Sequence, residues 1–257
     1  MLNKIERRPH YVEWNGDKIS EYWDVFGNIK PVSPWFSAKA SGFILKELKS
    51  LKKKYLTSKD IKVLDIGSGS GDLLGKIHQE LGFDCHGIDI STDRIEKARL
   101  TYPKLKFSKG SIINTGFDDK IFDIVISTQT IEHLLTEDLE FAFSEMSRVL
   151  KPGGIAFLTT RFEENLGERL KVCPDCLCIF SHSQHLQSFT QQSIENLFLK
   201  FGFTTIVSKK SLCRDSLKEF IPNSLKWVNF FVNPIFHKYM DKRLGKYLFA
   251  IGRKKNE

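Results

Sequence analysis

The chain has 257 residues, of which 41% are hydrophobic, and it carries a formal net charge of +8. This composition suits one α/β domain with elaborations, which can bury a full core without disulfides. The polar start argues against a signal peptide, and no run approaches the roughly 18 apolar residues of a transmembrane helix. The five cysteines do not form the pattern of a secreted disulfide framework, so a cytoplasmic protein is expected.

The first 59 residues precede the region of regular alternation. Residues 1–35 are polar and aromatic without a clear period, and Ser33-Pro34 suits the start of a helix. Apolar residues then recur at helical spacing, so an amphipathic helix is expected from Phe36 to Leu56.

From residue 60 onward, short apolar strands alternate with helical stretches, which is the pattern of parallel βαβ units. The first five expected strands are Lys62–Ile66, Asp84–Asp89, Leu105–Ser108, Asp123–Ser127 and Gly154–Thr159. Further strands are expected from Gly202-Phe203 and at Tyr247–Lys255, and helices at Asp72–Leu81 and Gln191–Phe201. The fold class is therefore α/β, with a mostly parallel sheet whose ligand site lies at the carboxyl ends of its strands.

A glycine-rich turn joins the first strand to the helix after it, a geometry that brings backbone N–H groups close to a ligand. Its three glycines are Gly67, Gly69 and Gly71. The dinucleotide fingerprint G-x-G-x-x-G needs a glycine where Asp72 stands, and Asp65 lies two residues before the first glycine. Asp89 ends the second strand about 20 residues past the turn, where a carboxylate can accept both ribose hydroxyls. Alternatively, Ser91 and Asp93 simply cap the next helix.

The stretch Val63-Leu-Asp-Ile-Gly-Ser-Gly-Ser-Gly-Asp72 resembles motif I of the class I S-adenosylmethionine-dependent methyltransferases. Residues 122–134 resemble motif IV of the small-molecule branch, including its Glu-His pair, and residues 145–154 match the helix and Pro-Gly-Gly turn that follow it. The resemblance covers residues 60–160 and implies a seven-stranded, mostly parallel sheet flanked by helices, with strand seven antiparallel. It also implies S-adenosylmethionine as cofactor and an N-terminal arm that covers the site, the alternative being helical packing on the sheet edge.

The same resemblance assigns the cofactor site. The acid and the glycine backbone would hold the methionine end, Asp89 the ribose, and Ile90 the adenine face. Family members usually carry an acid where Ser111 stands, although serine can still accept a hydrogen bond. The implied cofactor-binding residues are Asp65, Gly67, Ser68, Gly69, Gly71, Asp89, Ile90, Ser111, Ile112, Thr128 and Gln129.

Methyl transfer to a hydroxyl needs a positioned acceptor and a general base, for which histidine is suited. His133 follows the fourth strand, on the rim of the cofactor site by resemblance, and is the first candidate. Its alternative role is to brace the pocket. His185 is the second candidate, because residues 185–190 resemble part of the active-site lid of some family members.

The lid loop, at about residues 165–190, also contains a possible zinc-ligand pattern, Cys-x2-Cys followed by His-x2-His. The four predicted ligands are Cys173, Cys176, His182 and His185. Cys178 is a rival ligand, and a lid role for His185 competes with its use as a ligand. Free thiols in a lid and a redox function are the other interpretations.

The basic character belongs to the C-terminal segment, where 12 Lys and Arg stand against 4 Asp and Glu from Lys209 onward. Aromatic and basic residues alternate within residues 209–246, predicted to be a helical insertion. It could form a lid over the acceptor pocket, contact an anionic membrane surface, or bind single-stranded nucleic acid. The expected units are an arm and helix (1–59), the cofactor-binding core with its lid loop (60–208), the insertion (209–246), and a final strand and tail (247–257).

The predicted function is O-methylation of a small molecule, glycan or lipid-linked intermediate, by a cytoplasmic enzyme with peripheral membrane contact as an option. The Asn-Pro-Pro-Tyr signature of methylation on nucleobases or glutamine amides is absent from the sequence. An RNA methyltransferase that uses the basic insertion and a non-catalytic cofactor-binding module are the alternatives.

Overall fold

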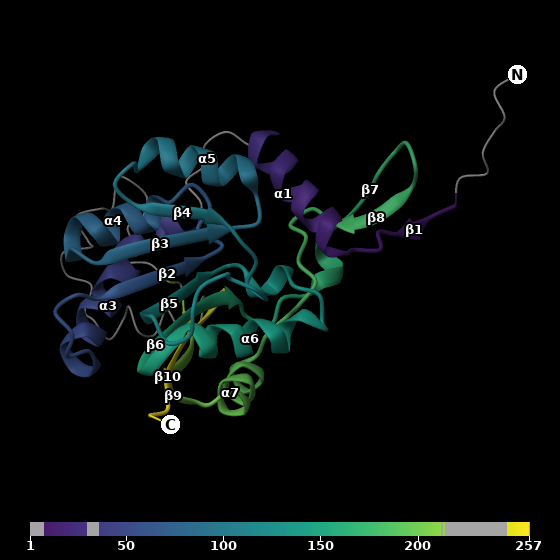
Figure 1. Ribbon diagram of the computed structural model, residues 1–257. Coiled ribbons are helices and arrows are strands. Elements are labelled where there is room, and N and C mark those ends of the chain that lie inside the picture. The colour runs from purple at the N-terminus through teal and green to yellow at the C-terminus, as the bar shows by residue number, and fades with distance from the viewer. Residues whose placement is uncertain (1–7, 30–35, 212, 214–245, 257) are drawn as a thin grey trace, which may run out of the picture.

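The computed structural model describes residues 8–29, 36–211, 213 and 246–256. Its centre is a seven-stranded sheet with the order β4-β3-β2-β5-β6-β10-β9 (Figure 1). The strands are β2 (Lys62–Ile66), β3 (Asp84–Asp89), β4 (Lys106–Lys109), β5 (Phe122–Thr128), β6 (Leu150–Arg161), β9 (Phe203–Ser211) and β10 (Tyr247–Lys254). β10 pairs antiparallel with both β6 and β9, while the pairs from β4 to β6 are parallel. The predicted fold class is confirmed.

Helices cover both faces of this sheet because successive strand residues point to opposite sides. The helices are α2 (Phe36–Lys39), α3 (Ser41–Tyr55), α4 (Asp72–Leu81), α5 (Thr92–Thr101), α6 (Asp138–Val149) and α7 (Gln191–Lys200). Val63 packs with residues of α3, α4 and α5 in one core cluster, whereas its neighbour Leu64 packs with residues of α6 and α7 in the other. The helix expected over residues 36–56 is divided at Ala40, where the backbone has φ −89° and ψ 0°.

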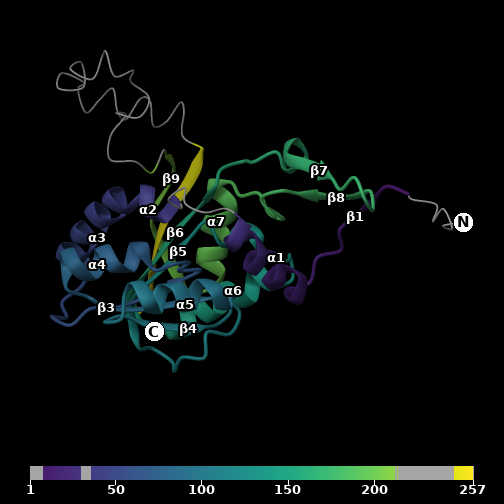
Figure 2. The same ribbon diagram turned by 90° about the horizontal axis from the view of Figure 1, so that it is seen from above.

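Within the expected N-terminal arm, residues 16–29 form helix α1 (Gly16–Ile29), although their sequence shows no clear period. Figure 1 shows α1 between α5 and a small second sheet with the order β1-β8-β7. Its strands are β1 (His10–Tyr11), β7 (Leu170–Val172) and β8 (Cys178–Ser181). Seen from above in Figure 2, this sheet stands off from the central one. Two short 3-10 helices, η1 (Ile131–His133) and η2 (Leu166–Arg169), complete the described elements.

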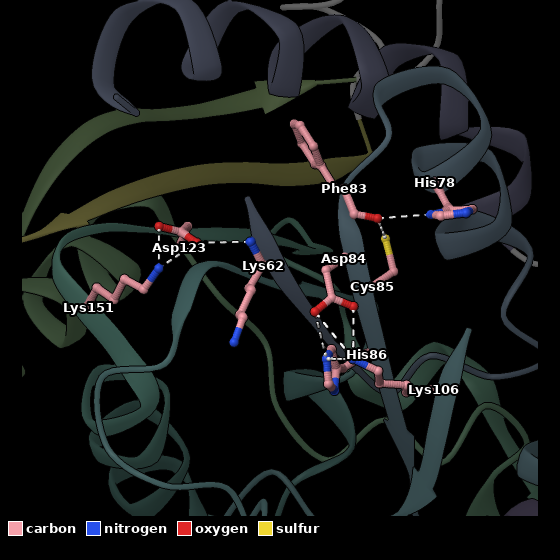
Figure 3. A network of polar contacts seen from close by, with 9 residues as sticks. All are labelled: Lys62, His78, Phe83, Asp84, Cys85, His86, Lys106, Asp123 and Lys151. Carbon is pink, nitrogen blue, oxygen red and sulfur yellow. Dashed lines mark hydrogen bonds and ion pairs between the residues drawn. The ribbon is translucent and has the colours of Figure 1, made fainter. Parts of the chain in front are cut away.

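Two sets of polar contacts join the amino ends of the five parallel strands, one across β2, β5 and β6 and one between β3 and β4 (Figure 3). Asp123, at the start of β5, accepts hydrogen bonds from the backbone N–H of Lys62 and from Lys151 Nζ, each at 2.9 Å. On β3, Asp84 forms an ion pair with Lys106 at 3.1 Å. These contacts fix the strand starts at the edge opposite the predicted ligand site, so the carboxyl ends remain available for function.

Among the described residues, none of the helices is long and apolar enough to cross a membrane. The predicted insertion lies almost entirely outside the described residues. Only its first residues, Lys209–Ser211, are seen as the end of β9, together with Cys213 and Lys246.

Candidate active site

The glycine turn after β2 folds tightly against β3. The backbone N–H groups of Gly67 and Ser68 both donate to the carbonyl oxygen of Ile88, at 2.8 and 2.9 Å. Gly67 has φ +79°, and a Cβ there would lie 2.3 Å from Thr130 Oγ1, so only glycine fits. A Cβ on Gly69 would instead meet open space. The turn is therefore packed on its protein side and open at its centre.

Asp89 lies at the end of β3 beside this turn. Its Oδ2 accepts from the Gly69 N–H and its Oδ1 from the Ser91 N–H, both at 2.9 Å. A carboxylate can accept about four hydrogen bonds, so each oxygen keeps capacity for a ligand hydroxyl. The Ser91 side chain separately caps α5 by accepting from the Arg94 N–H. The local cap and a ligand role for Asp89 are thus compatible.

Asp65 provides a test of whether the cofactor fits. Its side chain is buried, and Oδ1 has no hydrogen-bond partner among the described residues. Burial, aided by the charge of Asp89, raises the pKa of Asp65 to about 8. An unpaired buried acceptor is costly, and an ammonium group from a ligand would satisfy it. Asp65 and the open turn therefore fit the amino acid end of S-adenosylmethionine, and Asp89 fits its ribose.

The other predicted cofactor residues follow neighbouring strand ends. Ile90 is half-buried and comes after β3, while Ser111 and the buried Ile112 follow β4. Thr128 is buried at the end of β5. In the amide orientation that satisfies both of its atoms, Gln129 donates to Glu132 and accepts from the Thr160 N–H, each at 3.2 Å. The Gln129 side chain therefore lies against Glu132 and the end of β6.

The two candidate bases lie next to each other, with ring centroids 5.0 Å apart. His133 is enclosed by the Trp23 ring, at 4.7 Å, and its Nδ1 lies 3.2 Å from the carbonyl oxygen of Gln184. Burial lowers the pKa of His133 to about 3. The imidazole is consequently neutral near pH 7 and a weak proton acceptor, which agrees with its alternative role of bracing the pocket.

His185 has a different environment. Its Nδ1 makes a short hydrogen-bond contact with a carboxylate oxygen of Glu164, and Nε2 has no hydrogen-bond partner among the described residues. Arg169 Nε lies 3.0 Å from the other Glu164 oxygen, within ion-pair range but misaligned for a hydrogen bond. Burial would raise the pKa of Glu164, but the hydrogen bond to His185 and the charges of His185, Arg161 and Arg169 outweigh it and lower that pKa. An ionised Glu164 therefore orients the His185 ring.

Glu132 connects these groups to the sheet. Thr160 Oγ1 donates to its carboxylate at 2.9 Å, and its backbone carbonyl accepts from the N–H groups of Leu186 and Gln187. Burial raises the pKa of Glu132 to about 7. Ligand atoms of Glu132, His133 and His185 all lie within 4.8 Å of one another, so these three could also hold a metal ion.

Helix α1 joins the cofactor and acceptor sides. Ser20 Oγ donates to the Ile90 carbonyl at 3.3 Å, and the Arg94 guanidinium lies 4.9 Å from the Trp23 ring centre. Trp23 Nε1 then donates to the buried Gln184 side chain at 2.9 Å. These contacts agree with an arm that covers the site. No motif in the sequence predicts a role for Trp23, Gln184 or Glu164. Only the cluster of aromatic residues before position 36 could have pointed to Trp23.

The predicted zinc ligands are not assembled. Thiols of Cys173, Cys176 and Cys178 lie within 4.8 Å of one another at the tip of the β7–β8 hairpin. Because β8 carries the chain away from that tip, His182 lies near the Arg169 carbonyl and His185 beside Glu164. The rival ligand Cys178 takes part in the cluster, and the two histidines do not.

Comparisons with known proteins agree with this geometry. A sequence profile described as a methyltransferase domain matches residues 37–208. Over 165 residues the chain is 34% identical to a ubiquinone biosynthesis O-methyltransferase of Pelagibacter ubique, covering 62% of this chain and 66% of that protein. A demethylmenaquinone methyltransferase of Chlorobaculum tepidum is 28% identical over 167 residues, 62% of this chain and 68% of the relative. The structure of a Haemonchus contortus phosphoethanolamine N-methyltransferase with S-adenosyl-L-methionine has a TM-score of 0.59 at 17% identity, covering 92% of this chain and 60% of that one, and so supports the fold.

Proposed function

Because the chain belongs to the methyltransferase domain family and is an S-adenosylmethionine-dependent methyltransferase, we propose that it methylates a hydroxyl group of a small molecule, with His185 as general base. The short contact between His185 Nδ1 and the Glu164 carboxylate is the observation that carries this proposal. It resembles the arrangement in which an acid orients a histidine so that its other ring nitrogen can accept a proton.

The acceptor hydroxyl would lie near His185 Nε2 and opposite the glycine turn. S-adenosylmethionine, when bound, supplies a methyl group activated by its sulfonium. The acceptor oxygen would bond to that methyl carbon as the sulfur–methyl bond breaks, which would leave S-adenosylhomocysteine. His185 would accept the hydroxyl proton, and Glu164 would stabilise the imidazolium that results. Helix α1 and the lid residues around Gln184 exclude water and hold the acceptor in line. The proton then passes from His185 to solvent, which resets the base.

Two observations support His185 over His133 as the base. The pKa of about 3 for His133 makes proton transfer to it unfavourable near neutral pH. Its Nδ1 also faces the Gln184 carbonyl, and no carboxylate among the described residues orients it. We assign a positioning role to His133. Its ring packs against both Trp23 of α1 and His185, and so holds the proposed base in place against the arm.

The proposed acceptor classes are a free small molecule, a glycan or a lipid-linked intermediate. The relative names favour the first, since a ubiquinone biosynthesis O-methyltransferase and a demethylmenaquinone methyltransferase are among the matches. We propose the same cofactor contacts as the family resemblance implies, with Asp65 and Asp89 as their main side chains. We also propose peripheral membrane contact by residues 209–246, most of which lie outside the described part of the chain.

A labelling experiment tests both the reaction and the acceptor class. Methyl-labelled S-adenosylmethionine is incubated with the purified protein and host extract, which is then separated into organic, small-molecule, polysaccharide and RNA fractions. Base-stable label in any of the first three agrees with O-methylation of the proposed acceptors. Label confined to RNA supports the alternative, and cofactor binding without transfer supports a non-catalytic module.

The matched variants are His185→Asn and His182→Asn. Loss of the base should lower kcat by about 10²–10⁴-fold and leave cofactor affinity unchanged. His182→Asn should keep wild-type activity, because the Tyr22 hydroxyl contacts only the His182 backbone carbonyl. Full activity of His185→Asn would refute the assignment of the base while leaving the methyltransferase itself intact.

A further inference from the structure

The tip of the β7–β8 hairpin gathers three thiols that the proposed reaction does not use. Cys173, Cys176 and Cys178 are free, and their sulfur atoms lie within 4.8 Å of one another. Cys176 is exposed and the other two are half-buried. Thiolate sulfur is a preferred ligand of zinc, and a closed structural zinc site needs four ligands in a tetrahedron. The cluster lacks one ligand.

The backbone of the tip holds the thiols in place. The Cys173 N–H donates to the Cys178 carbonyl, and the Leu177 N–H donates to the Cys173 carbonyl, both at 2.9 Å. Leu177 has φ +60°, a left-handed conformation that costs a side-chain-bearing residue about 1–2 kcal/mol. Little apolar burial offsets this cost, since Val172 is 56% exposed and Leu170 is 38% exposed. Metal binding would give such a turn the stability that a hydrophobic core provides elsewhere.

His10 lies beside this cluster on a strand from the other end of the chain. β1 pairs in parallel with β8 so that His10 is the register partner of Cys178, and its N–H donates to the Leu177 carbonyl at 3.4 Å. The His10 ring is exposed, with Nδ1 3.1 Å from the Arg8 carbonyl. The register therefore places His10 beside Cys178, one of the three thiols of the cluster.

We propose that Cys173, Cys176, Cys178 and His10 form a structural zinc site that fastens the start of the chain to the lid hairpin. Zinc would displace the three thiol protons and bind three thiolates at about 2.3 Å and one neutral imidazole nitrogen at about 2.0 Å. To bind the ion, the His10 ring would have to turn from the Arg8 carbonyl toward Cys178, its register partner. This ligand set replaces the Cys2His2 set expected from the sequence.

The site would act on the acceptor side from a distance. β1 leads directly to α1, whose Tyr22 hydroxyl donates to the His182 carbonyl at 2.6 Å and whose Trp23 holds Gln184. β8 leads to the same two residues, His182 and Gln184, and then to His185. A metal ion that joins β1 to β8 would therefore fix the position of helix α1 relative to residues 182–185 of the lid. The inference does not depend on which acceptor is methylated.

Metal content tests the site directly. The full chain is purified under reducing conditions, and zinc is counted by native mass spectrometry and by titration against a chromogenic chelator. One zinc per chain is expected, with loss of the ion in Cys176→Ser. Cobalt(II) in place of zinc should give a thiolate-to-cobalt charge-transfer band and the intense visible bands of a tetrahedral ion.

His10→Ala and His182→Ala are the decisive pair. Changing residues merely near a zinc ligand typically costs 10–100-fold in affinity, so loss of a direct ligand should weaken zinc binding by at least about tenfold. His182→Ala should bind zinc as the wild type does. Failure to bind zinc, unchanged affinity in His10→Ala, or weakening only in His182→Ala would overturn the proposal. So would a disulfide among the three cysteines in the protein as isolated from reducing cytosol.

Discussion

The cofactor side and the acceptor side of the site are built in opposite ways. The cofactor side depends on short-range geometry, because the turn after β2 and the end of β3 lie on adjacent parallel strands. The acceptor side gathers Trp23, His133, Glu164 and His185 from four separate segments. Its contacts span up to 161 residues of sequence, as between Trp23 and Gln184. One side can therefore be recognised from a motif, whereas the other requires the assembled fold.

The two sides also differ in the surroundings of their buried carboxylates. Asp65 on the cofactor side has a buried oxygen without a partner, a group suited to an incoming ligand. Glu164 on the acceptor side is already compensated by His185, Arg161 and Arg169. Both carboxylates keep one buried oxygen without a hydrogen bond, but only Glu164 has cationic side chains beside it. The proposed proton-transfer pair would therefore be preorganised before an acceptor binds.

The largest effect is expected on the cofactor side. Asp89→Ala removes a carboxylate that would accept two ribose hydroxyls, each charged hydrogen bond contributing about 1.5–3 kcal/mol. Affinity for S-adenosylmethionine should fall by about 100-fold or more, measured by calorimetry. Asp84→Ala, on the same strand at its opposite end, is the control and should bind normally. Equal affinity of Asp89→Ala and wild type would remove the ribose contact from the assignment.

The preorganised pair is tested by Glu164→Gln, alone and combined with His185→Asn. Without the carboxylate the ring loses its orientation, and kcat should fall by about 10–100-fold with cofactor affinity retained. Because Glu164 acts through His185, the double variant should be no slower than His185→Asn alone. Additive losses measured in the same turnover assay would show that Glu164 works independently of His185.

A smaller effect concerns the pH dependence of stability. Burial raises the pKa of Glu132 from its ordinary 4.5 to about 7, so the folded state favours the protonated form. Its stabilising contribution is complete below about pH 4.5 and is lost as pH rises through about 7. The free energy of unfolding of Glu132→Gln relative to wild type should therefore improve by on the order of 1.4 kcal/mol per pH unit across that window. Denaturant titrations at pH 5, 6, 7 and 8 measure this, and a pH-independent difference would contradict the buried, protonated state.

The smallest effect is expected at the contact between arm and lid. Tyr22→Phe removes the hydroxyl that donates to the His182 carbonyl at 2.6 Å but keeps the stacked ring contact with Phe26. A net loss of about 0.5–1.5 kcal/mol in unfolding free energy is expected. Faster amide exchange should be confined to residues of α1 and β8, whereas global destabilisation of the central sheet would show that the arm is part of its core.

Sequence patterns predicted the central fold because its signals are local. The strands at Lys62–Ile66 and Asp84–Asp89 and the helix at Asp72–Leu81 match the structure to the residue. The arm helix α1 escaped prediction because its aromatic residues pack on the lid and on one another, as Tyr22 does on Trp14 and Phe26, and so leave no simple apolar period.

A motif in the sequence predicts residues only on the cofactor side of the candidate site. His133 and His185 stay predicted bases, and the sequence ranked them without knowledge of their surroundings, which lower the pKa of His133 to about 3 through burial. Glu164 escaped because its role depends on a contact with His185, 21 residues later, made by the return of the lid. The predicted metal ligands show a similar dependence on the fold: spacing suggested His182 and His185, which lie outside the cluster of three thiols, while strand pairing places His10 beside Cys178.

The pairing of β9 with β10 has a consequence for how this enzyme could change. Ser211 and Tyr247 are register partners, so the chain leaves the sheet and re-enters it at adjacent points. Tyr247 is also paired with Arg161, which lies 3.8 Å from Glu164. The β6–β10–β9 pairing thus fixes both points where the chain leaves and re-enters the sheet. A change of sequence between these two points would leave every one of those strand pairs in place.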